Sequence, residues 1–372
     1  MKSKNINYMP RVDHLRLYAA LLVILVHSYM AAGGGNSENF FMFPIMYGST
    51  GVTLFLVLSG FLFTLISDFG NKDIKYSKFI TNRILRVFPL LILVSFTSVA
   101  VMRGSVTVND FLSTFLFSNL TSTPLSKFFG PTWTIAVELQ FYLIFPFIIA
   151  FVRNSGVKYL LGLIAFWLVW RALIVFQVNP EGVAVDNSFY YLTIIGRLDQ
   201  FLVGMLAAFA YRRFGDALKN PLYLVGSTIF ILFTLYYMPV LGIWYTPLPI
   251  KSMLQTWEAI AWAALIVSYL RCSFSFLPRT SHVLSKLGEL SYSAYITHGL
   301  VLYVIEKNNW WISISSDQNL NAFLNGLLVV FPPVMAVSWL SFTFIEKPFL
   351  TLRKAYTTKV AKPEVKKIDA PA

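Results

Sequence analysis

The stretch RVDHLRLYAALLVILVH, residues 11–27, decides what kind of protein this is. Charged residues at its start lead into an apolar run that ends on a histidine. Arg16 and His27 are eleven residues apart, which at about 100° per residue places both on one helix face, about 16 Å apart along the axis. Ionisable side chains inside a membrane are costly and usually mark a functional site. We therefore expect this face to carry chemistry.

The composition is that of a membrane protein with several spans. Of 372 residues, 56% are hydrophobic and 13% are charged, and the mean hydropathy is +0.64. A soluble domain has about 25% charged residues, so a large soluble domain is not expected. The net charge of +13 could indicate nucleic-acid binding, but the basic residues concentrate in short loops, as membrane topology requires. We expect the lipid bilayer as a partner and no nucleic acid.

Hydropathy and segment length predict an all-α polytopic membrane protein with about ten transmembrane helices. A further apolar piece at residues 110–120 is too short to cross the bilayer. The expected spans are residues 15–32, 43–66, 84–102, 133–152, 158–177, 189–211, 221–238, 253–270, 287–305 and 321–345.

The distribution of Lys and Arg predicts the orientation of these spans. With the N-terminus inside, the inner segments carry 22 Lys and Arg residues and the outer segments carry 4. This asymmetry follows the positive-inside rule and predicts that both termini are cytoplasmic. We expect one transmembrane domain over residues 1–350 and a basic, disordered cytoplasmic tail over residues 351–372. The polar, basic start of the chain does not indicate a cleaved signal peptide.

Two arginines stand at the predicted cytoplasmic end of the third span. Arg83 and Arg86, in NRILRVFPL, are i, i+3 neighbours on one helix face. Two adjacent guanidinium groups can bind phosphate oxygens. They can also anchor the helix at lipid headgroups, and spacing alone favours the anchor.

Glu138, in PTWTIAVELQFYLIFP, is expected a turn or two below the outer surface, in the depth range of His27. A carboxylate beside an imidazole can fix its tautomer and stabilise its cation. Trp133 occupies a position typical of interfacial aromatics. Tyr142 follows Glu138 by one turn and can either hydrogen-bond to it or simply pack.

Later spans contain further polar residues. Arg197 and Asp199, in IIGRLDQFLVG, are candidates for an internal ion pair or for a substrate site. His298 lies among small and hydroxyl residues, which is more typical of a hydrogen-bonded packing residue than of a catalyst. Glu346 precedes Lys347 and is explained by a salt bridge at a helix end.

Several kinds of site are not indicated. The small residues around Ser59 and Gly60 are explained by close helix packing and do not by themselves indicate a site. The four histidines and Cys272 do not have the spacing of metal ligands, so no metal is expected. Neither G-x-S-x-G nor a P-loop occurs.

Taken together, these residues suggest a phosphate-binding cytoplasmic end connected to a histidine and a carboxylate deeper in the membrane. Acyl-CoA, with a charged nucleotide head and a long arm ending in a thioester, suits such an arrangement. The residues alone leave a transporter of glycolipids or small solutes, and a non-catalytic assembly subunit, as alternatives. We find no internal repeat of the kind common in transporters.

The ordered motifs of this chain resemble those of the membrane-bound acyltransferase-3 family, bacterial integral-membrane O-acyltransferases that mostly acetylate sugars. The resemblance covers nearly all of residues 10–350. The motifs are RVDHLRLYAALLVILVH (11–27), GVTLFLVLSGFLF (51–63), NRILRVFPL (82–90), TWTIAVELQFYLIFP (132–146), GRLDQFLVG (196–204), LSYSAYITH (290–298) and FIEKP (344–348).

The resemblance implies a reaction and a location. An acyl group, most often acetyl, passes from acyl-CoA as co-substrate to a hydroxyl of a cell-surface carbohydrate or its lipid-linked precursor, in the bacterial inner (cytoplasmic) membrane. His27 and Glu138 are then the reaction-centre candidates, with His27 as general base and Glu138 orienting its ring. A covalent acyl-histidine relay is an open variant. The donor-binding candidates are Arg16, Arg83 and Arg86, and the candidates for lining the site are Asp13, Ser59, Trp133, Tyr142, Arg197 and His298.

One departure from the family pattern bears on the acceptor. Some members carry a C-terminal extracytoplasmic SGNH-type hydrolase-like domain, whereas here the last expected span ends near residue 345 and a short basic tail follows. We therefore expect the membrane domain, or another protein, to handle the acceptor. The longest outer connection, residues 103–132, is the expected region of acceptor contact.

Overall fold

A computed structural model describes residues 5–36, 39–101, 132–178, 191–240, 251–274 and 276–359. Helices make up most of these residues, and two short strands pair beside them, so the predicted all-α class is confirmed. Residues 103–131, which include the apolar piece at 110–120 and most of the expected acceptor region, lie outside the described residues.

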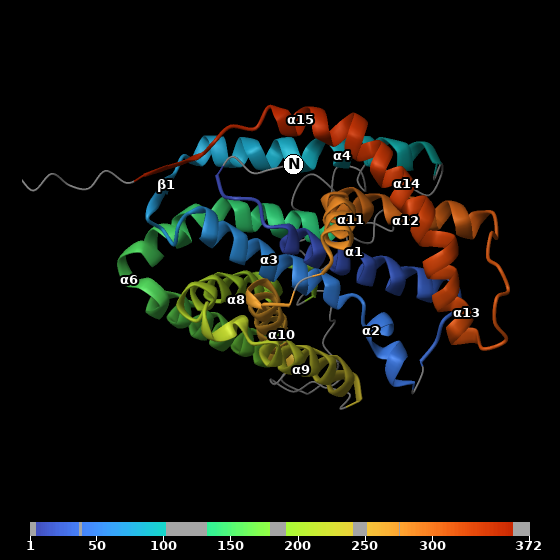
Figure 1. Cartoon of the computed structure of the whole chain (residues 1–372), viewed down its shortest axis with the longest axis horizontal. Coiled ribbons are helices and arrows are strands. Elements are labelled where there is room, and N and C mark those ends of the chain that lie inside the picture. Colours follow the sequence, from blue (N-terminus) through green and yellow to red (C-terminus); the bar gives the residue numbers. More distant parts are fainter. Residues whose placement is uncertain are drawn as a thin grey trace, which may run out of the picture.

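The helices alternate with short connections throughout the described chain (Figure 1). In the first half they are α1 (Pro10–Ala31), η1 (Phe40–Met42), α2 (Phe43–Met46), α3 (Thr50–Ile66), α4 (Tyr76–Val101) and α6 (Trp133–Val178). The second half contains α8 (Ile194–Arg213), η4 (Ala217–Lys219), α9 (Pro221–Val240), α10 (Lys251–Arg271), α11 (Pro278–Glu289), α12 (Ser291–Lys307), α13 (Gln318–Asn325), η6 (Gly326–Val330), α14 (Phe331–Ser341), η7 (Phe342–Glu346) and α15 (Lys347–Thr351). The strands are β1 (Lys72–Ile74) and β2 (Thr357–Lys359).

The helices occupy all ten ranges in which spans are expected. The helix α6 covers two of them, because Gly156 has a non-helical backbone conformation with φ 62° and divides it. Among the described residues, six helical segments are long and apolar enough to cross a membrane, and α3 and α9 are shorter apolar helices. The count of ten crossings and the cytoplasmic position of both termini remain predictions.

The helix α1 is central to the packing. It contacts α3, α11 and α12, and its apolar residues are buried on several sides, as in a helix enclosed by neighbours. The helices α3 and α8 approach one another closely. A Cβ atom on Gly60 would lie 2.0 Å from the Phe201 carbonyl oxygen, and one on Gly204 would lie 2.1 Å from that of Val57. The expectation that small residues near Gly60 allow close packing is confirmed.

The chain after the last helix is held against α4. Residues 352–359, here called the C-terminal strap, end in β2, which pairs antiparallel with β1 so that Asp73 lies opposite Thr358. The amide of Lys75 donates to the Tyr356 carbonyl at 2.9 Å. The structure thus describes residues 351–359 of the expected tail, and residues 360–372 lie outside the described residues.

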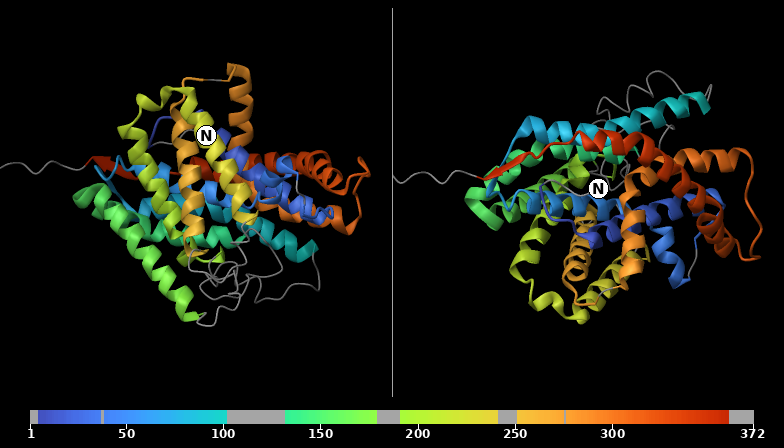
Figure 2. Two further views of the ribbon diagram at one scale, coloured as in Figure 1. Left: turned by 90° about the horizontal axis from the view of Figure 1, so that it is seen from below. Right: turned by 45° about the horizontal axis from the view of Figure 1, so that its top comes forward.

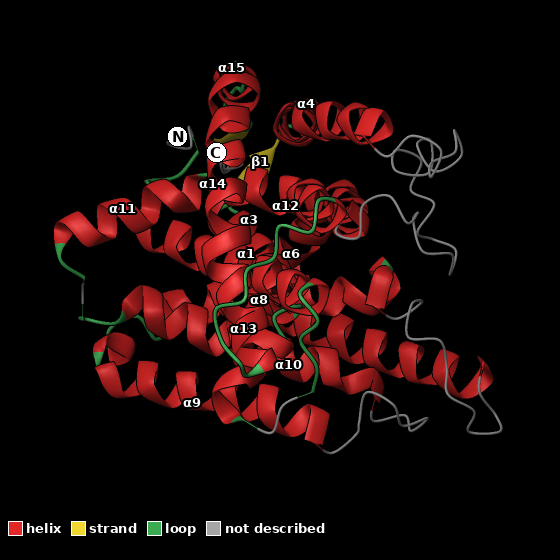
Figure 3. Ribbon diagram, turned by 90° about the vertical axis from the view of Figure 1, so that its right-hand side faces the viewer, coloured by secondary structure: helices red, strands yellow, loops and turns green. Residues whose placement is uncertain are grey.

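The pictures place these elements in space. Figure 1 shows β1, β2 and the bend of α6 at one end of the molecule, and α2 with the connection before α13 at the other. Figure 2 shows the segment of η7 and α15 running along α4, in agreement with the contacts of α4 with η7 and α15. In Figure 3, α4 and α15 lie on one side of the molecule and α9 lies on the opposite side.

Candidate active site

Four arginines from three separate parts of the chain line one cavity of about 140 Å³. Arg16 comes from α1, Arg83 and Arg86 from α4, and Arg353 from the C-terminal strap. The three arginines proposed from the sequence as donor-binding residues are thus brought together, with Arg353 as an addition. The carboxylates in the lining are Asp13 and Glu289. Because Arg16 Nη1 already pairs with Asp13 Oδ1 at 3.1 Å, the cavity keeps an excess of positive charge.

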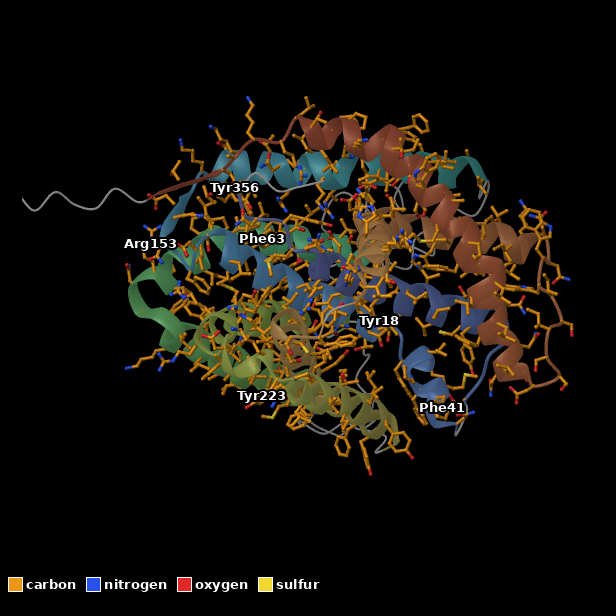
Figure 4. The ribbon with its side chains drawn as sticks, viewed as in Figure 1. Tyr18, Phe41, Phe63, Arg153, Tyr223 and Tyr356 are labelled. Atoms are coloured by element: carbon orange, nitrogen blue, oxygen red, sulfur yellow. The ribbon has the colours of Figure 1, made fainter. Side chains whose placement is uncertain are left out.

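The guanidinium of Arg83 is surrounded by aromatic rings. Its Cζ atom lies 5.2 Å from the ring centre of Phe63, 5.6 Å from Phe79, 5.7 Å from Tyr142 and 5.9 Å from Tyr356. Figure 4 shows Phe63 and Tyr356 near one another below α4. Cation–π attraction to these rings holds the guanidinium, while its buried Nε atom has no hydrogen-bond partner among the described residues. The sequence contains each of these aromatic residues, but it does not show that their rings surround one arginine.

Arg353 was missed because it lies in a segment expected to be disordered. Burial and, to a lesser extent, the charges of Arg86 and Arg83 together lower the pKa of Arg353 to about 10. The side chain is therefore still a cation at neutral pH, and it is crowded by like charges. A polyanion bound among these groups would relieve that repulsion.

A second cavity of about 120 Å³ continues from the arginines into the helix bundle. It shares Arg16, Arg83 and Arg86 with the first cavity and reaches Glu138. Ser59 lines it as well, and Ser59 Oγ donates to Glu138 Oε1 at 2.9 Å. Its other lining residues are mostly apolar or aromatic, and include Phe55, Leu62, Tyr142, Tyr292 and Tyr295. Glu138 and the arginines thus line one path that runs from the first cavity into the second.

Behind Arg86 lies a buried carboxylate. Glu346 is 2% exposed and accepts a hydrogen bond from Ser293 Oγ. Arg86 itself lies 5.8 Å from the ring centre of Tyr292. The expected salt bridge between Glu346 and Lys347 does not occur among the described residues, because the π-helical turn η7 directs Glu346 inward toward α12.

The second candidate region surrounds the ring of His27. His27 Nδ1 lies 2.9 Å from the Val23 carbonyl oxygen and 3.3 Å from Nε2 of His298. His298 is 1% exposed, and its Nδ1 lies 2.7 Å from the carbonyl oxygen of Tyr295. His298 does have the hydrogen bonds expected of a packing residue, but one of its partners is the proposed base.

The geometry changes the role assigned to Glu138. Across the described part of the chain, no hydrogen bond joins His27 to Glu138; His27 is held by Val23 and His298, and Glu138 binds Ser59. The two regions are connected through Tyr295, which lines the second cavity and whose ring lies 5.9 Å from that of His298. The proposed orientation of His27 by Glu138 is therefore wrong as a direct contact.

The proposed ion pair of Arg197 with Asp199 is also wrong. Asp199 Oδ1 instead pairs with Arg171 Nη1 at 3.0 Å, and both side chains are fully buried. Arg197 stacks on Tyr191 at 4.0 Å and lies 5.5 Å from the Trp133 ring. Residues two apart on a helix point about 200° apart, so Arg197 and Asp199 face different sides of α8 and have different partners. Neither Arg197 nor Trp133 lines the two cavities described above.

Comparison with known proteins gives a consistent picture. Residues 9–343 match a family model described as an acyltransferase domain. The chain is similar to Nodulation protein 10 of Rhizobium leguminosarum bv. viciae, with 24% identity over 380 residues, 93% of this chain and 95% of that protein. It is also similar to a putative O-acetyltransferase of Staphylococcus aureus (strain MSSA476), with 25% identity over 94% of this chain and 58% of that protein.

A third relative is the peptidoglycan O-acetyltransferase OatA of Listeria monocytogenes serovar 1/2a, with 27% identity over 92% of this chain and 56% of that protein. The chain therefore spans little more than half the length of this relative and of the staphylococcal one. No solved structure matches.

Proposed function

Since this chain belongs to the acyltransferase-3 family of membrane proteins, we propose that it transfers an acetyl group from acetyl-CoA to a hydroxyl of a carbohydrate or its lipid-linked precursor. Two of the similar proteins are named as O-acetyltransferases, and one of these as acting on peptidoglycan, which supports both the acetyl group and a carbohydrate acceptor. The proposed location is the bacterial cytoplasmic membrane.

The observation that carries the proposal is the path from the four arginines to Glu138. The head of acetyl-CoA bears a diphosphate and a further phosphate, which match the clustered guanidinium groups of Arg83, Arg86 and Arg353. Its flexible arm suits the mostly apolar second cavity that begins at these arginines. In this proposal the phosphates bind at the end of α4 that is predicted to be cytoplasmic, where acyl-CoA is available.

The chemistry proposed for the deeper end is general-base catalysis. His27 Nε2 removes the proton of the acceptor hydroxyl, and the resulting alkoxide oxygen forms a bond to the thioester carbonyl carbon. The carbon–sulfur bond then breaks, and the leaving thiolate recovers the proton from the His27 imidazolium. Glu138, which is held by Ser59, is assigned to accept a hydrogen bond from the carbohydrate substrate and so to position the hydroxyl of that substrate.

A binding measurement tests the donor. Purified protein in detergent is titrated with acetyl-CoA by calorimetry, in wild-type form and as Arg83→Gln, His27→Gln and Lys78→Gln. Lys78 is an exposed cation on the same helix and is absent from the lining of both cavities, so it controls for loss of charge. We expect micromolar binding that Arg83→Gln weakens at least tenfold and that the other two variants keep within twofold. No binding by well-folded wild-type protein would reject acetyl-CoA as the donor.

An activity measurement tests the base. Membrane vesicles containing the protein are supplied with radiolabelled acetyl-CoA, and label in the carbohydrate fraction is counted. General-base catalysis contributes about 10² to 10⁴-fold, so His27→Gln should lower the rate by at least about a hundredfold at equal expression. A near-wild-type rate in this variant would overturn the assignment of His27.

A further inference from the structure

Two histidine rings from helices far apart in the chain form a contact inside the bundle. His27 of α1 and His298 of α12 are 271 residues apart, yet their ring centres lie 5.2 Å apart. His298 is enclosed, whereas His27 is partly accessible between buried neighbours in α1. His298 is therefore the buried ring of the pair, and His27 is the accessible ring.

The hydrogen bonds determine the tautomer of the buried ring. His298 Nδ1 lies 2.7 Å from the Tyr295 carbonyl oxygen, which can only accept. Nδ1 must therefore carry the proton. In a neutral imidazole the other nitrogen is then unprotonated, so His298 Nε2 is an acceptor.

The same reasoning determines the tautomer of the reachable ring. His27 Nδ1 faces two groups, the Val23 carbonyl oxygen at 2.9 Å and His298 Nε2 at 3.3 Å. Both are acceptors, so His27 Nδ1 must be the protonated nitrogen and Nε2 must carry the lone pair. The opposite tautomer would set the lone pair of Nδ1 against the lone pairs of both neighbours.

We propose that His298 is a positioning residue that holds His27 in the tautomer with a proton on Nδ1 and a bare Nε2, the form that a base attacking an acceptor hydroxyl requires. This inference rests on the proposed function for its catalytic meaning. In this pair, a neutral imidazole takes the place of the carboxylate that commonly orients a catalytic histidine.

The arrangement also explains how the pair responds when His27 is protonated. After Nε2 takes the proton, the imidazolium still donates from Nδ1 to Val23 and His298, and these hydrogen bonds become charge-assisted and stronger. No proton needs to move between the two rings. His298 therefore stabilises the product of proton abstraction without touching the substrate.

Nitrogen NMR of the histidine side chains tests the tautomer directly. The chain has four histidines, so ¹⁵N-histidine labelling gives four ring systems. His298→Gln, His27→Gln and the exposed-site variant His282→Gln assign the signals. We expect the His27 Nδ1 signal of the wild type to be that of a protonated nitrogen and the Nε2 signal that of an unprotonated one. A His27 ring protonated on Nε2 would overturn the proposal.

Two substitutions at the buried ring test the role. His298→Leu removes the acceptor, and His298→Gln can restore an acceptor oxygen near the position of Nε2. Hydrogen-bond partners that orient histidine ligands of metals are worth about 10- to 100-fold, and we expect a comparable fall in kcat for His298→Leu with an unchanged KM for acetyl-CoA. His298→Gln should recover much of that loss.

Each result is informative on its own. An unchanged kcat in well-folded His298→Leu, or an equal loss of kcat in both variants, would refute the positioning role. The NMR spectrum of the wild type reports the tautomer whether or not acetyl-CoA is the donor. A failure of the proposed function is therefore distinguishable from a failure of this inference.

Discussion

Asn82 binds the backbone of Lys354 at both its carbonyl oxygen and its amide. Asn82 Nδ2 donates to the Lys354 carbonyl at 2.6 Å, and the Lys354 amide donates to Asn82 Oδ1 at 3.1 Å. This buried asparagine on α4 thus anchors the C-terminal strap between two residues of functional interest. Arg353, on one side, lines the arginine cavity, and Tyr356, on the other, packs on Arg83.

Asn82→Ala should release the C-terminal strap and weaken donor binding. Each lost hydrogen bond contributes about 0.5–1.5 kcal/mol, and the strap carries one of the four arginines. We expect faster hydrogen exchange in residues 352–359 and a several-fold rise in the acetyl-CoA Kd, with kcat at saturating donor unchanged. Asn71→Ala, an exposed asparagine beside β1, is the matched control. Unaltered exchange in the strap would contradict the anchoring role.

Arg353→Gln should stabilise the donor-free protein while weakening donor binding. The pKa of Arg353 is lowered from 12.5 to about 10, first by burial and then by Arg86 and Arg83. The unfolded chain therefore binds more protons between pH 10 and 12.5, so the charged guanidinium destabilises the fold at every pH below about 10. Thermal unfolding at pH 7.5 should show a higher Tm for Arg353→Gln than for Arg213→Gln, which removes an exposed arginine.

The same group predicts a pH dependence for binding. CoA affinity of the wild type should be flat near neutral pH and should fall as the pH rises toward about 10, because the Arg353 guanidinium then loses its charge. Calorimetry with CoA, which has no thioester to hydrolyse, measures this. Arg353→Gln should lack that part of the decline, and an identical profile in both proteins would exclude Arg353 from the donor site.

Arg83→Lys should weaken donor binding although it preserves the charge. An ammonium group cannot reproduce the planar contacts of the guanidinium with four aromatic rings, among them Phe63 and Tyr356. A cation–π contact is worth about 0.5–2 kcal/mol, so we expect a rise in the acetyl-CoA Kd of about tenfold. Arg86→Lys, at a site with one such ring, should have a smaller effect. Equal effects of the two substitutions would show that the rings do not matter.

Breaking the buried pair of Arg171 and Asp199 should strongly lower the unfolding free energy of the protein. Both side chains are fully buried, and Arg171 Nη1 also donates to the Gly196 carbonyl at 2.9 Å. Removing one member of a buried pair costs about 3–5 kcal/mol, so Arg171→Met should strongly lower the unfolding free energy in detergent. A double-mutant cycle with Asp199→Asn should give a large coupling energy, whereas the cycle of Arg197→Met with Asp199→Asn should give a small one.

Local features of this protein followed from the sequence because helix geometry is local. The hydropathy of the chain predicted helices in all ten ranges, and the i, i+3 spacing of Arg83 and Arg86 placed both on one face, where both line the two cavities. The ordered motifs also indicated the acyltransferase-3 family, which the family model over residues 9–343 confirms. Each of these depends on backbone hydrogen bonds between near neighbours or on the order of residues.

The partners of the polar side chains were decided only by the tertiary structure. Asp199 pairs with Arg171 and not with its neighbour Arg197, and His27 contacts His298 and not Glu138. Arg353 reaches the arginine cavity because the C-terminal strap folds back on α4. These contacts join residues on different helices, so they depend on how the helices pack and rotate against one another. A 3.6-residue period describes which face a side chain occupies, but not which helix that face meets.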